Sequence, residues 1–171
     1  MELRTAQPAD LASIQSIYAH HVLHGLGTFE TEPPALDEMV SRHAQITAAG
    51  FPYLVAVEAN HVIGYAYANH FRTRAAYRHT VEDSVYVAPT ALGRGVGKAL
   101  LNELIARCRS QGLQQMLAVI GDSGNVASIG VHRACGFESV GVMKSVGRKF
   151  DRWVDVVVMQ RALAPGAGGA D

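Results

Sequence analysis

Hydrophobic residues recur along the chain with the two periods that mark helices and strands, and the two kinds of segment alternate. Residues 9–25 carry a helical stripe that Gly25 ends, and residues 36–50 carry a second one. The members of the first stripe are Leu11, Ile14, Ile17, Tyr18 and Val22. The prolines in residues 28–34 require a loop between the two helices. Residues 53–71 predict two strands joined by a tight turn.

The second half of the chain predicts a strand, a glycine-rich turn and a long helix in succession. In the strand at residues 80–87, alternation separates the side chains of Val81, Asp83, Val85 and Val87 from those of Thr80, Glu82, Ser84 and Tyr86. The helix that follows runs from about Gly95 to Ser110 and buries a leucine-rich stripe. The remaining predicted elements are strands at residues 114–121, 137–147 and 152–161 and a short helix at residues 125–136.

With a short strand at residues 2–6, these segments amount to about seven strands and about four helices. The predicted fold class is therefore α/β, with a mixed central sheet. A chain of 171 residues, of which 49% are hydrophobic, suits one domain with a substantial core, and we place that domain at residues 1–163. The small, glycine-rich tail at residues 164–171 is expected to be disordered.

Charge and cysteine content exclude several classes of partner. The 15 Lys and Arg residues balance 15 Asp and Glu residues, so we expect neither nucleic acid nor a membrane surface as a partner. No apolar run approaches the ~20 residues of a membrane span, and the N-terminus has no secretory signal. Cys108 and Cys135 form neither a metal-type pair nor a disulfide framework, and no metal site is expected. These features predict a cytoplasmic protein with reduced thiols.

Residues 91–100, ALGRGVGKAL, form a glycine-rich turn of the kind that lets backbone approach a phosphate. A P-loop would need a glycine at Leu92 and a hydroxyl at Ala99, and a dinucleotide fingerprint begun at Gly95 would need a glycine at Leu100. Both motifs fail. What remains is a nest of backbone N–H groups that binds a pyrophosphate without a metal, or a turn with no ligand.

The order of these segments resembles the GCN5-related N-acetyltransferase (GNAT) family. The resemblance rests on the strand SVYVAP, the glycine turn, the long helix and a later segment, NVASIGVHRACGF, that carries Asn125, Ser128, His132, Gly136 and Phe137. It implies a GNAT fold whose sheet is splayed at the cofactor site, acetyl-CoA as co-substrate, and a homodimer. One departure is Leu92, where the family usually has Gln or Arg; we expect it to cost affinity at most, because the phosphate contacts are mainly backbone N–H groups.

The resemblance also implies which residues contact the cofactor. They are Val85, Tyr86, Val87, Gly93, Arg94, Gly95, Val96, Gly97, Lys98, Asn125 and Ser128. Four strings are similar to a narrower subgroup, the phosphinothricin and methionine sulfoximine acetyltransferases: TFETEPP, FRTRAAYRHTVEDSVYV, SIGVHRACGF and VGRKFDRWVDVVVMQ. The subgroup implies a small-molecule amine as the acceptor.

The chemistry of such a transfer assigns roles to particular side chains. A base must take a proton from the acceptor's ammonium before nitrogen can attack the thioester, and Glu82 resembles the carboxylate assigned as that base. Asp83 points to the other face of a regular strand and is the weaker candidate, unless a bulge reverses the two. His132 stands where many relatives carry a tyrosine that protonates the CoA thiolate, and it can serve as that acid or as a second base. Backbone N–H groups of Val85 and Val87 are expected to hold the oxyanion.

The acceptor end is expected to be an acid-binding pocket. Arg72 and Arg74 lie two residues apart, and their guanidinium groups suit the carboxylate and the phosphinate or sulfoximine oxygens of a glutamate-like molecule. Tyr77, Phe29 and Glu30 would shape this pocket. The alternative is a pair of solvated surface arginines.

Two other functions compete with this interpretation. The first is acetylation of a protein or peptide amine, which needs an open groove rather than a closed pocket. The second is a non-catalytic acyl-CoA-binding module, which would keep the glycine turn but would not need a base. The presence of Glu82 and His132 together argues against the module.

Overall fold

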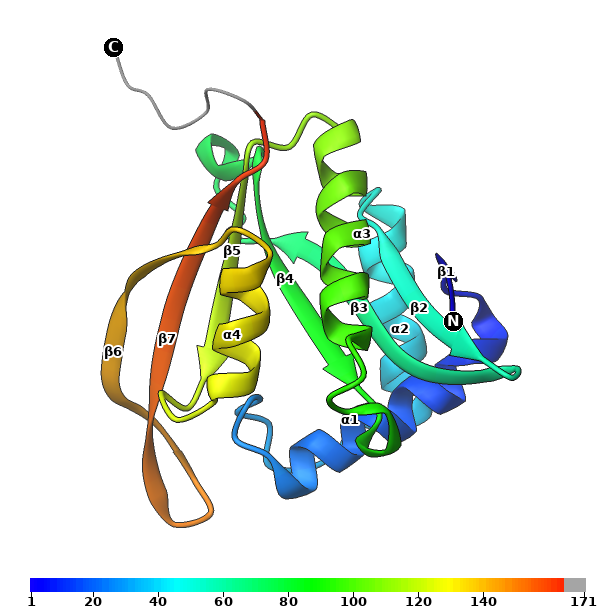
Figure 1. Ribbon diagram of the computed structural model, residues 1–171, viewed down its shortest axis with the longest axis horizontal. Coiled ribbons are helices and arrows are strands. Elements are labelled where there is room, and N and C mark those ends of the chain that lie inside the picture. The colour runs from blue at the N-terminus through cyan, green and yellow to red at the C-terminus, as the bar shows by residue number, and fades with distance from the viewer. Residues whose placement is uncertain (165–171) are drawn as a thin grey trace.

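The computed structural model describes residues 1–164, which form one mixed sheet with helices on both faces (Figure 1). The strands are β1 (Glu2–Thr5), β2 (Tyr53–Glu58), β3 (His61–His70), β4 (Thr80–Val87), β5 (Gln115–Gly121), β6 (Glu138–Lys149) and β7 (Arg152–Ala162). The helices are α1 (Leu11–His24), α2 (Leu36–Ala48), α3 (Val96–Ser110) and α4 (Val126–Ala134). Within the described residues, the predicted α/β class and the predicted strands and helices are confirmed. The disorder expected of residues 164–171 concerns residues that, apart from Ala164, lie outside the described part.

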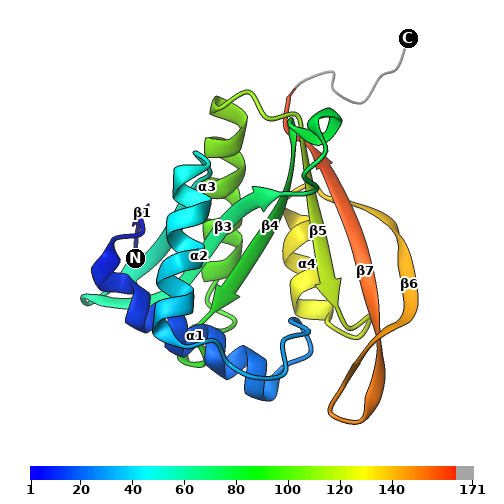
Figure 2. The same cartoon turned by 180° about the vertical axis from the view of Figure 1, so that it is seen from behind.

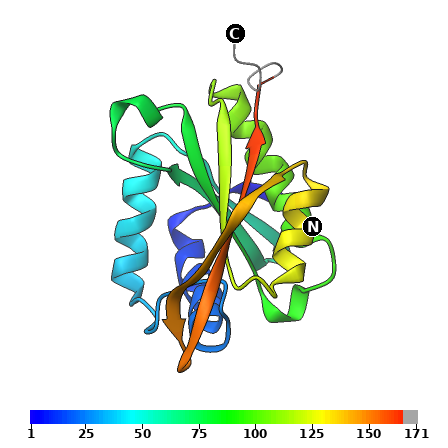
Figure 3. The same ribbon diagram turned by 90° about the vertical axis from the view of Figure 1, so that its left-hand side faces the viewer.

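The helices form two layers, because the sheet is apolar on both faces. α1 and α2 cover one face and α3 and α4 cover the other (Figures 2 and 3). Helix α3 buries Leu100, Leu101 and Leu104 completely, and each contributes about 2 kcal/mol through removal of its side chain from water. No helix of residues 1–164 is long and apolar enough to cross a membrane.

The sheet has the order β1-β2-β3-β4-β5-β7-β6, and only β4 and β5 run parallel to each other. Their pairing covers three residues on each strand, from Thr80 opposite Gln115 to Glu82 opposite Leu117. Beyond Glu82 both strands continue but diverge (Figure 1). The sheet is therefore splayed at its centre, between β4 and β5. Antiparallel pairing with β3 holds β4 in place, and antiparallel pairing with β7 holds β5 in place.

Candidate active site

The splay leaves one row of backbone N–H groups on β4 without strand partners. Ala88 N donates to the Ile63 carbonyl at 2.9 Å, and in this antiparallel register every second residue back to Thr80 is bonded to β3. The residues in between direct their N–H groups toward β5, which is no longer alongside beyond Glu82. The last parallel pair, Glu82 with Leu117, still uses the N–H group of Asp83, so the residues whose N–H groups lack a strand partner are Val85 and Val87.

The divergence opens into a cleft of about 980 Å³. Its walls are the loop after α1, strand β4, the glycine turn, the end of β5 and one side of α4. Tyr86 also borders the cleft, but its ring packs edge-on against Tyr18 at 5.0 Å on the α1 face. Of the predicted contacts on β4, Val85 and Val87 therefore offer free N–H groups, whereas Tyr86 contributes packing.

The glycine turn forms the end of the cleft nearest α3. Gly93 and Gly95 have φ angles of +72° and +80°, a region that glycine adopts without strain. No side chain caps α3, and the first amide with an intrahelical acceptor is that of Ala99, which donates to Gly95 O at 3.0 Å. The N–H groups of residues 96–98 thus stand free at the positive end of the helix dipole, as a pyrophosphate site requires.

Arg94, by contrast, turns its side chain away from these N–H groups. Its Nη2 lies 2.6 Å from Glu58 Oε2 in an ion pair on the surface. Lys98 is exposed at the mouth of the cleft and lines it. The turn consequently offers backbone N–H groups and one lysine, and none of its features calls for a metal.

Glu82 stands at the apex of the splay, half-buried on the face that α1 and α2 cover. It lies directly opposite Asn69 on β3. Burial, reinforced by the neighbouring charge of Asp83, raises the pKa of Glu82 above its usual range, and the charge of Arg72 partly opposes this. A carboxylate with a raised pKa is a better proton acceptor than an exposed one, which suits a general base.

Asp83 and His132 form a buried pair on the opposite face of the sheet. His132 Nε2 lies 3.0 Å from Asp83 Oδ1, and the two side chains are 6% and 2% exposed. The other ring nitrogen, Nδ1, lies 2.7 Å from the carbonyl oxygen of Ser128. Sequence reasoning selected His132 but missed its partner, because the two residues are 49 positions apart and no local pattern links them.

Asn125 and Ser128 hold the start of α4 beside the cleft. Asn125 is the N-cap of α4, since its Oδ1 accepts a hydrogen bond from Ser128 N at 3.1 Å. Its amide nitrogen is 3.5 Å from Gly121 O at the end of β5. The Asn125 side chain therefore fixes the helix against β5, and both residues line the cleft.

A central splay, a free helix N-terminus and two carboxylates at the apex match the site of an acyl-CoA-dependent transferase. The profile of the Acetyltransferase (GNAT) family matches residues 14–137. The chain belongs to the GNAT family. Phosphinothricin N-acetyltransferase of Alcaligenes faecalis is 54% identical over 164 residues, which are 96% of this chain and 83% of that protein.

Two further GNAT proteins match over almost the full length. L-methionine sulfoximine/L-methionine sulfone acetyltransferase of Pseudomonas aeruginosa is 43% identical, with 95% of each chain covered. The crystal structure of a phosphinothricin acetyltransferase from Sinorhizobium meliloti, in complex with acetyl-CoA, has a TM-score of 0.94 and 50% identity, and covers 99% of this chain and 91% of that one. The fold predicted from the resemblance is thereby confirmed, and acetyl-CoA is the co-substrate of this GNAT chain.

Phe29 and Glu30 lie in the loop between α1 and α2, directly after Thr28, which lines the cleft. The ring of Phe29 lies against Gly121 and Gly147. A Cβ atom at Gly147 would collide with this ring, and one at Gly121 would collide with the carbonyl oxygen of Leu26. Lys149, 3% exposed, donates from Nζ to Thr28 O at 2.9 Å and ties the loop to the end of β6. The loop is thus held against both β5 and β6.

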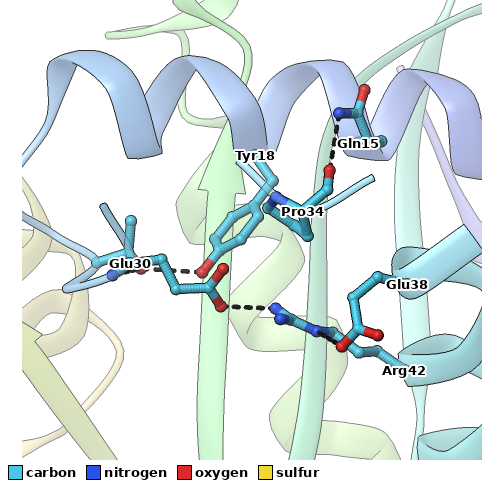
Figure 4. Close-up of polar contacts among 7 residues, drawn as sticks. Gln15, Tyr18, Glu30, Pro34, Glu38 and Arg42 are labelled. Carbon is cyan, nitrogen blue, oxygen red and sulfur yellow. Dashed lines mark hydrogen bonds and ion pairs between the residues drawn. The ribbon is translucent and has the colours of Figure 1, made fainter. Parts of the chain in front are cut away.

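Glu30 has a partner that the sequence did not indicate. Arg42 of α2 lies 2.6 Å from Glu30 through Nη1 and 2.8 Å from Glu38 through Nε (Figure 4). Gln15 bonds the Pro34 carbonyl at 3.0 Å in the same region (Figure 4). The spacing of Glu38 and Arg42 by four residues is a recognisable helix pair, but the cross-link to Glu30 depends on the loop conformation.

Arg72, Arg74 and Tyr77 lie in the exposed connection between β3 and β4. Tyr77 packs edge-on against Phe71 at 5.6 Å, and the Arg72 guanidinium lies 5.2 Å from the Phe71 ring centre. The charge of Arg72 also acts on Glu82 and lowers its pKa, against the effect of Asp83. The structure thus brings Arg72 near the apex, whereas no contact of the Arg74 side chain with the site is seen among the described residues.

Within residues 1–164, no three His, Cys, Asp or Glu side chains gather as a metal site would need.

Proposed function

We propose that this chain transfers the acetyl group of acetyl-CoA to the amino group of a phosphinothricin- or methionine sulfoximine-type amino acid, by direct attack in a ternary complex. The observation that carries the proposal is the place of Glu82, a half-buried carboxylate where β4 leaves β5, next to unpaired backbone N–H groups. The names of the relatives that match nearly the whole chain support the acceptor class.

The two faces of the sheet divide the chemistry between them. Glu82 accepts a proton from the acceptor's ammonium on the α1–α2 face, and the free amine attacks the acyl carbon. The N–H groups of Val85 and Val87 stabilise the negative oxygen that forms. His132 supplies the proton for the leaving thiolate from the α3–α4 face. The base therefore acts on the acceptor amine from one face of β4, and the acid acts on the leaving sulfur from the other face.

The cofactor and the acceptor enter from different ends of the cleft. The amides of residues 93–98 hold the pyrophosphate, and β4 and Asn125 hold the pantetheine arm. Arg72 and Arg74 bind the acidic oxygens of the acceptor, while Phe29, Glu30 and Tyr77 shape its pocket. The charge of Arg72 beside Glu82 favours an acceptor that presents an acid group close to its amine.

A thiol-release assay with acetyl-CoA tests this function. Phosphinothricin, methionine sulfoximine and methionine sulfone are the expected acceptors, and glutamate, whose distal carboxylate is planar rather than tetrahedral, is the matched control. We expect at least one tetrahedral analogue to be turned over at about ten or more times the rate of glutamate. A ratio of this size corresponds to about one hydrogen bond that the planar carboxylate of glutamate cannot make. Acetylation of peptide amines alone would favour the open-groove alternative, and acetyl-CoA binding with no turnover would favour the binding module.

We further propose that the enzyme works in the cytoplasm, where acetylation of phosphinothricin would give resistance to this herbicide. Cys108 and Cys135 are both free thiols and both buried, a state that suits a reducing compartment.

A homodimer is also part of the proposal, with β6 and β7 as the contact surface. β6 is one of the two edge strands of the sheet, and the hairpin of β6 and β7 extends beyond the remaining strands (Figure 1). Trp153 is 67% exposed, so it belongs to a surface and not to the core. The exposed apolar side chains of this hairpin are Val140, Val142, Met143, Val146, Phe150 and Trp153. A second copy of the chain supplies the apolar cover that such an edge needs.

The Val142→Glu/Trp153→Glu double variant is expected to be a monomer. Both changes place charge at the centre of the proposed contact, where it would be buried without a partner. Light scattering should give 18.3 kDa for this variant and twice that mass for the wild type. Leu36→Lys, an exposed position on α2, is the matched control and should stay dimeric. A wild-type protein of 18.3 kDa would contradict the dimer.

A further inference from the structure

The hydrogen bonds of His132 determine how many protons it holds. Its Nδ1 lies 2.7 Å from a backbone carbonyl oxygen, which can only accept, so Nδ1 carries a proton. Its Nε2 lies 3.0 Å from a carboxylate oxygen of Asp83, and a second proton must lie in that bond. The pair is therefore either an imidazolium facing a carboxylate or a neutral imidazole facing a carboxylic acid. In both forms it holds one proton more than a neutral histidine beside an ionised aspartate.

The surroundings of the pair keep this proton in place. Burial raises the pKa of Asp83, whose Oδ2 has no hydrogen-bond partner in the described structure. Burial alone would lower the pKa of His132, but the hydrogen bond and charge of Asp83 raise it above its ordinary value. The ring of Phe137 closes one side of the imidazole, edge-on at 5.0 Å.

The other titratable groups that face the pair are neutral or lie across the sheet. Burial raises the pKa of the Cys108 thiol on α3 to about 12, and it also raises that of Cys135 after α4. Both thiols are thus uncharged near neutrality. Glu82 lies on the opposite face of β4, where the charge of Asp83 helps to raise the pKa of Glu82. No other described group competes with Asp83 for the proton on His132.

Ser128 is the more exposed polar side chain that contacts this pair at the cleft. The hydroxyl of Ser128 lies 3.4 Å from His132 Nδ1, one helical turn earlier on α4. Ser128 is half-buried and lines the cleft, and Asp83 and His132 border the cleft too, although their side chains are only 2% and 6% exposed. We infer that Asp83, His132 and Ser128 form a proton relay in which the Ser128 hydroxyl delivers the proton to the leaving thiolate and Asp83 is a positioning residue. This inference rests on the proposed function.

The relay conserves atoms and charge at each step. When the carbon–sulfur bond breaks, its electron pair goes to sulfur, which takes the proton of the Ser128 hydroxyl. The Ser128 oxygen then takes the proton from His132 Nδ1. A proton stays on Nε2 in the bond to Asp83, which leaves a neutral imidazole beside a carboxylate. The Ser128 hydroxyl can now donate to Nδ1, and a proton from water restores the starting state.

Steady-state kinetics of Ser128 variants test the relay, with the best acceptor from the thiol-release assay. Ser128→Ala is expected to lower kcat at least about tenfold, the low end of what a proton donor contributes, and to leave KM for acetyl-CoA within about twofold. Ser128→Thr keeps a hydroxyl and should retain most of the activity. Ser110→Ala, at the exposed end of α3, is the matched control and should behave as wild type. Wild-type kcat in Ser128→Ala would overturn the relay.

The pH profile tests the role of Asp83 separately. Because Asp83 raises the pKa of His132, Asp83→Asn should move the alkaline limb of kcat to lower pH. If the alkaline limb of kcat does not move, Asp83 is not a positioning residue. If Asp83→Asn does not fold, the kinetics of Ser128→Ala and Ser128→Thr still test the relay. A wild-type protein that binds acetyl-CoA but acetylates no amine would overturn the proposed function itself, which separates the two failures.

Discussion

The Glu82→Gln enzyme is expected to lose at least about a hundredfold in kcat, while its KM for acetyl-CoA stays near that of the wild type. Glutamine has nearly the same shape as glutamate but cannot accept the ammonium proton, so the acceptor amine stays protonated. Glu82 lies on the α1–α2 face, away from the N–H groups that point into the splay. Replacement of the Glu82 carboxylate should therefore lower the rate of the chemical step and leave the binding of acetyl-CoA unchanged.

The pH dependence gives a second measurement of the same residue. Burial and the charge of Asp83 raise the pKa of Glu82, so the wild-type kcat should rise with pH through an acid limb above the usual carboxyl range. That limb should disappear in Glu82→Gln. Glu138→Gln, at an exposed position of β6, is the matched control and should keep both kcat and the limb. Unchanged turnover in Glu82→Gln would remove Glu82 from the mechanism.

Local patterns were sufficient to predict the elements of this fold. The five positions assigned to the first helical stripe, from Leu11 to Val22, are all buried in α1. The alternation in TVEDSVYV assigned Glu82 and Asp83 to opposite faces, and β4 runs through them with no bulge against β3. These successes share a cause, since both periods depend on backbone geometry within a few residues. The short 3₁₀ turns, such as Ala75–Tyr77, have no comparable period and were not predicted.

The site could be predicted only where its residues belong to a contiguous motif. The glycine turn and His132 were found because each lies in a string that resembles the GNAT family. Strand alternation correctly separates Asp83 from Glu82, but the bond of Asp83 to His132 crosses from β4 to α4 and depends on the packing of α4. The bond between Glu30 and Arg42 likewise depends on how the loop after α1 folds back. Such contacts have no signature in a single sequence.

The Gly97→Asp variant is expected to fold at least as well as the wild type and to bind acetyl-CoA at least about a hundredfold more weakly, which corresponds to about 2.7 kcal/mol. A Cβ atom at Gly97 would lie 3.5 Å from a Val87 methyl group and 3.9 Å from a Val85 methyl group, which are ordinary contacts. A carboxylate in the first turn of α3 interacts favourably with the helix dipole, by about 0.3–1 kcal/mol. The same carboxylate occupies the position where the free N–H groups would otherwise meet a phosphate.

Stability and affinity should thus change in opposite directions, and this combination distinguishes a phosphate site from a structural turn. Calorimetry with coenzyme A and a thermal melt measure the two quantities on the same sample. Gly97→Ala, the matched control, adds the Cβ without the charge and should lower affinity by only a few-fold, because the backbone N–H groups remain unobstructed by charge. A Gly97→Asp protein that binds coenzyme A as the wild type does would contradict the nest. Only a negative ligand competes with the new carboxylate for the same N–H groups, so a loss of affinity without a loss of stability indicates a phosphate site. Parallel losses of stability and affinity would instead indicate that the glycine is needed for the packing of α3 against β4.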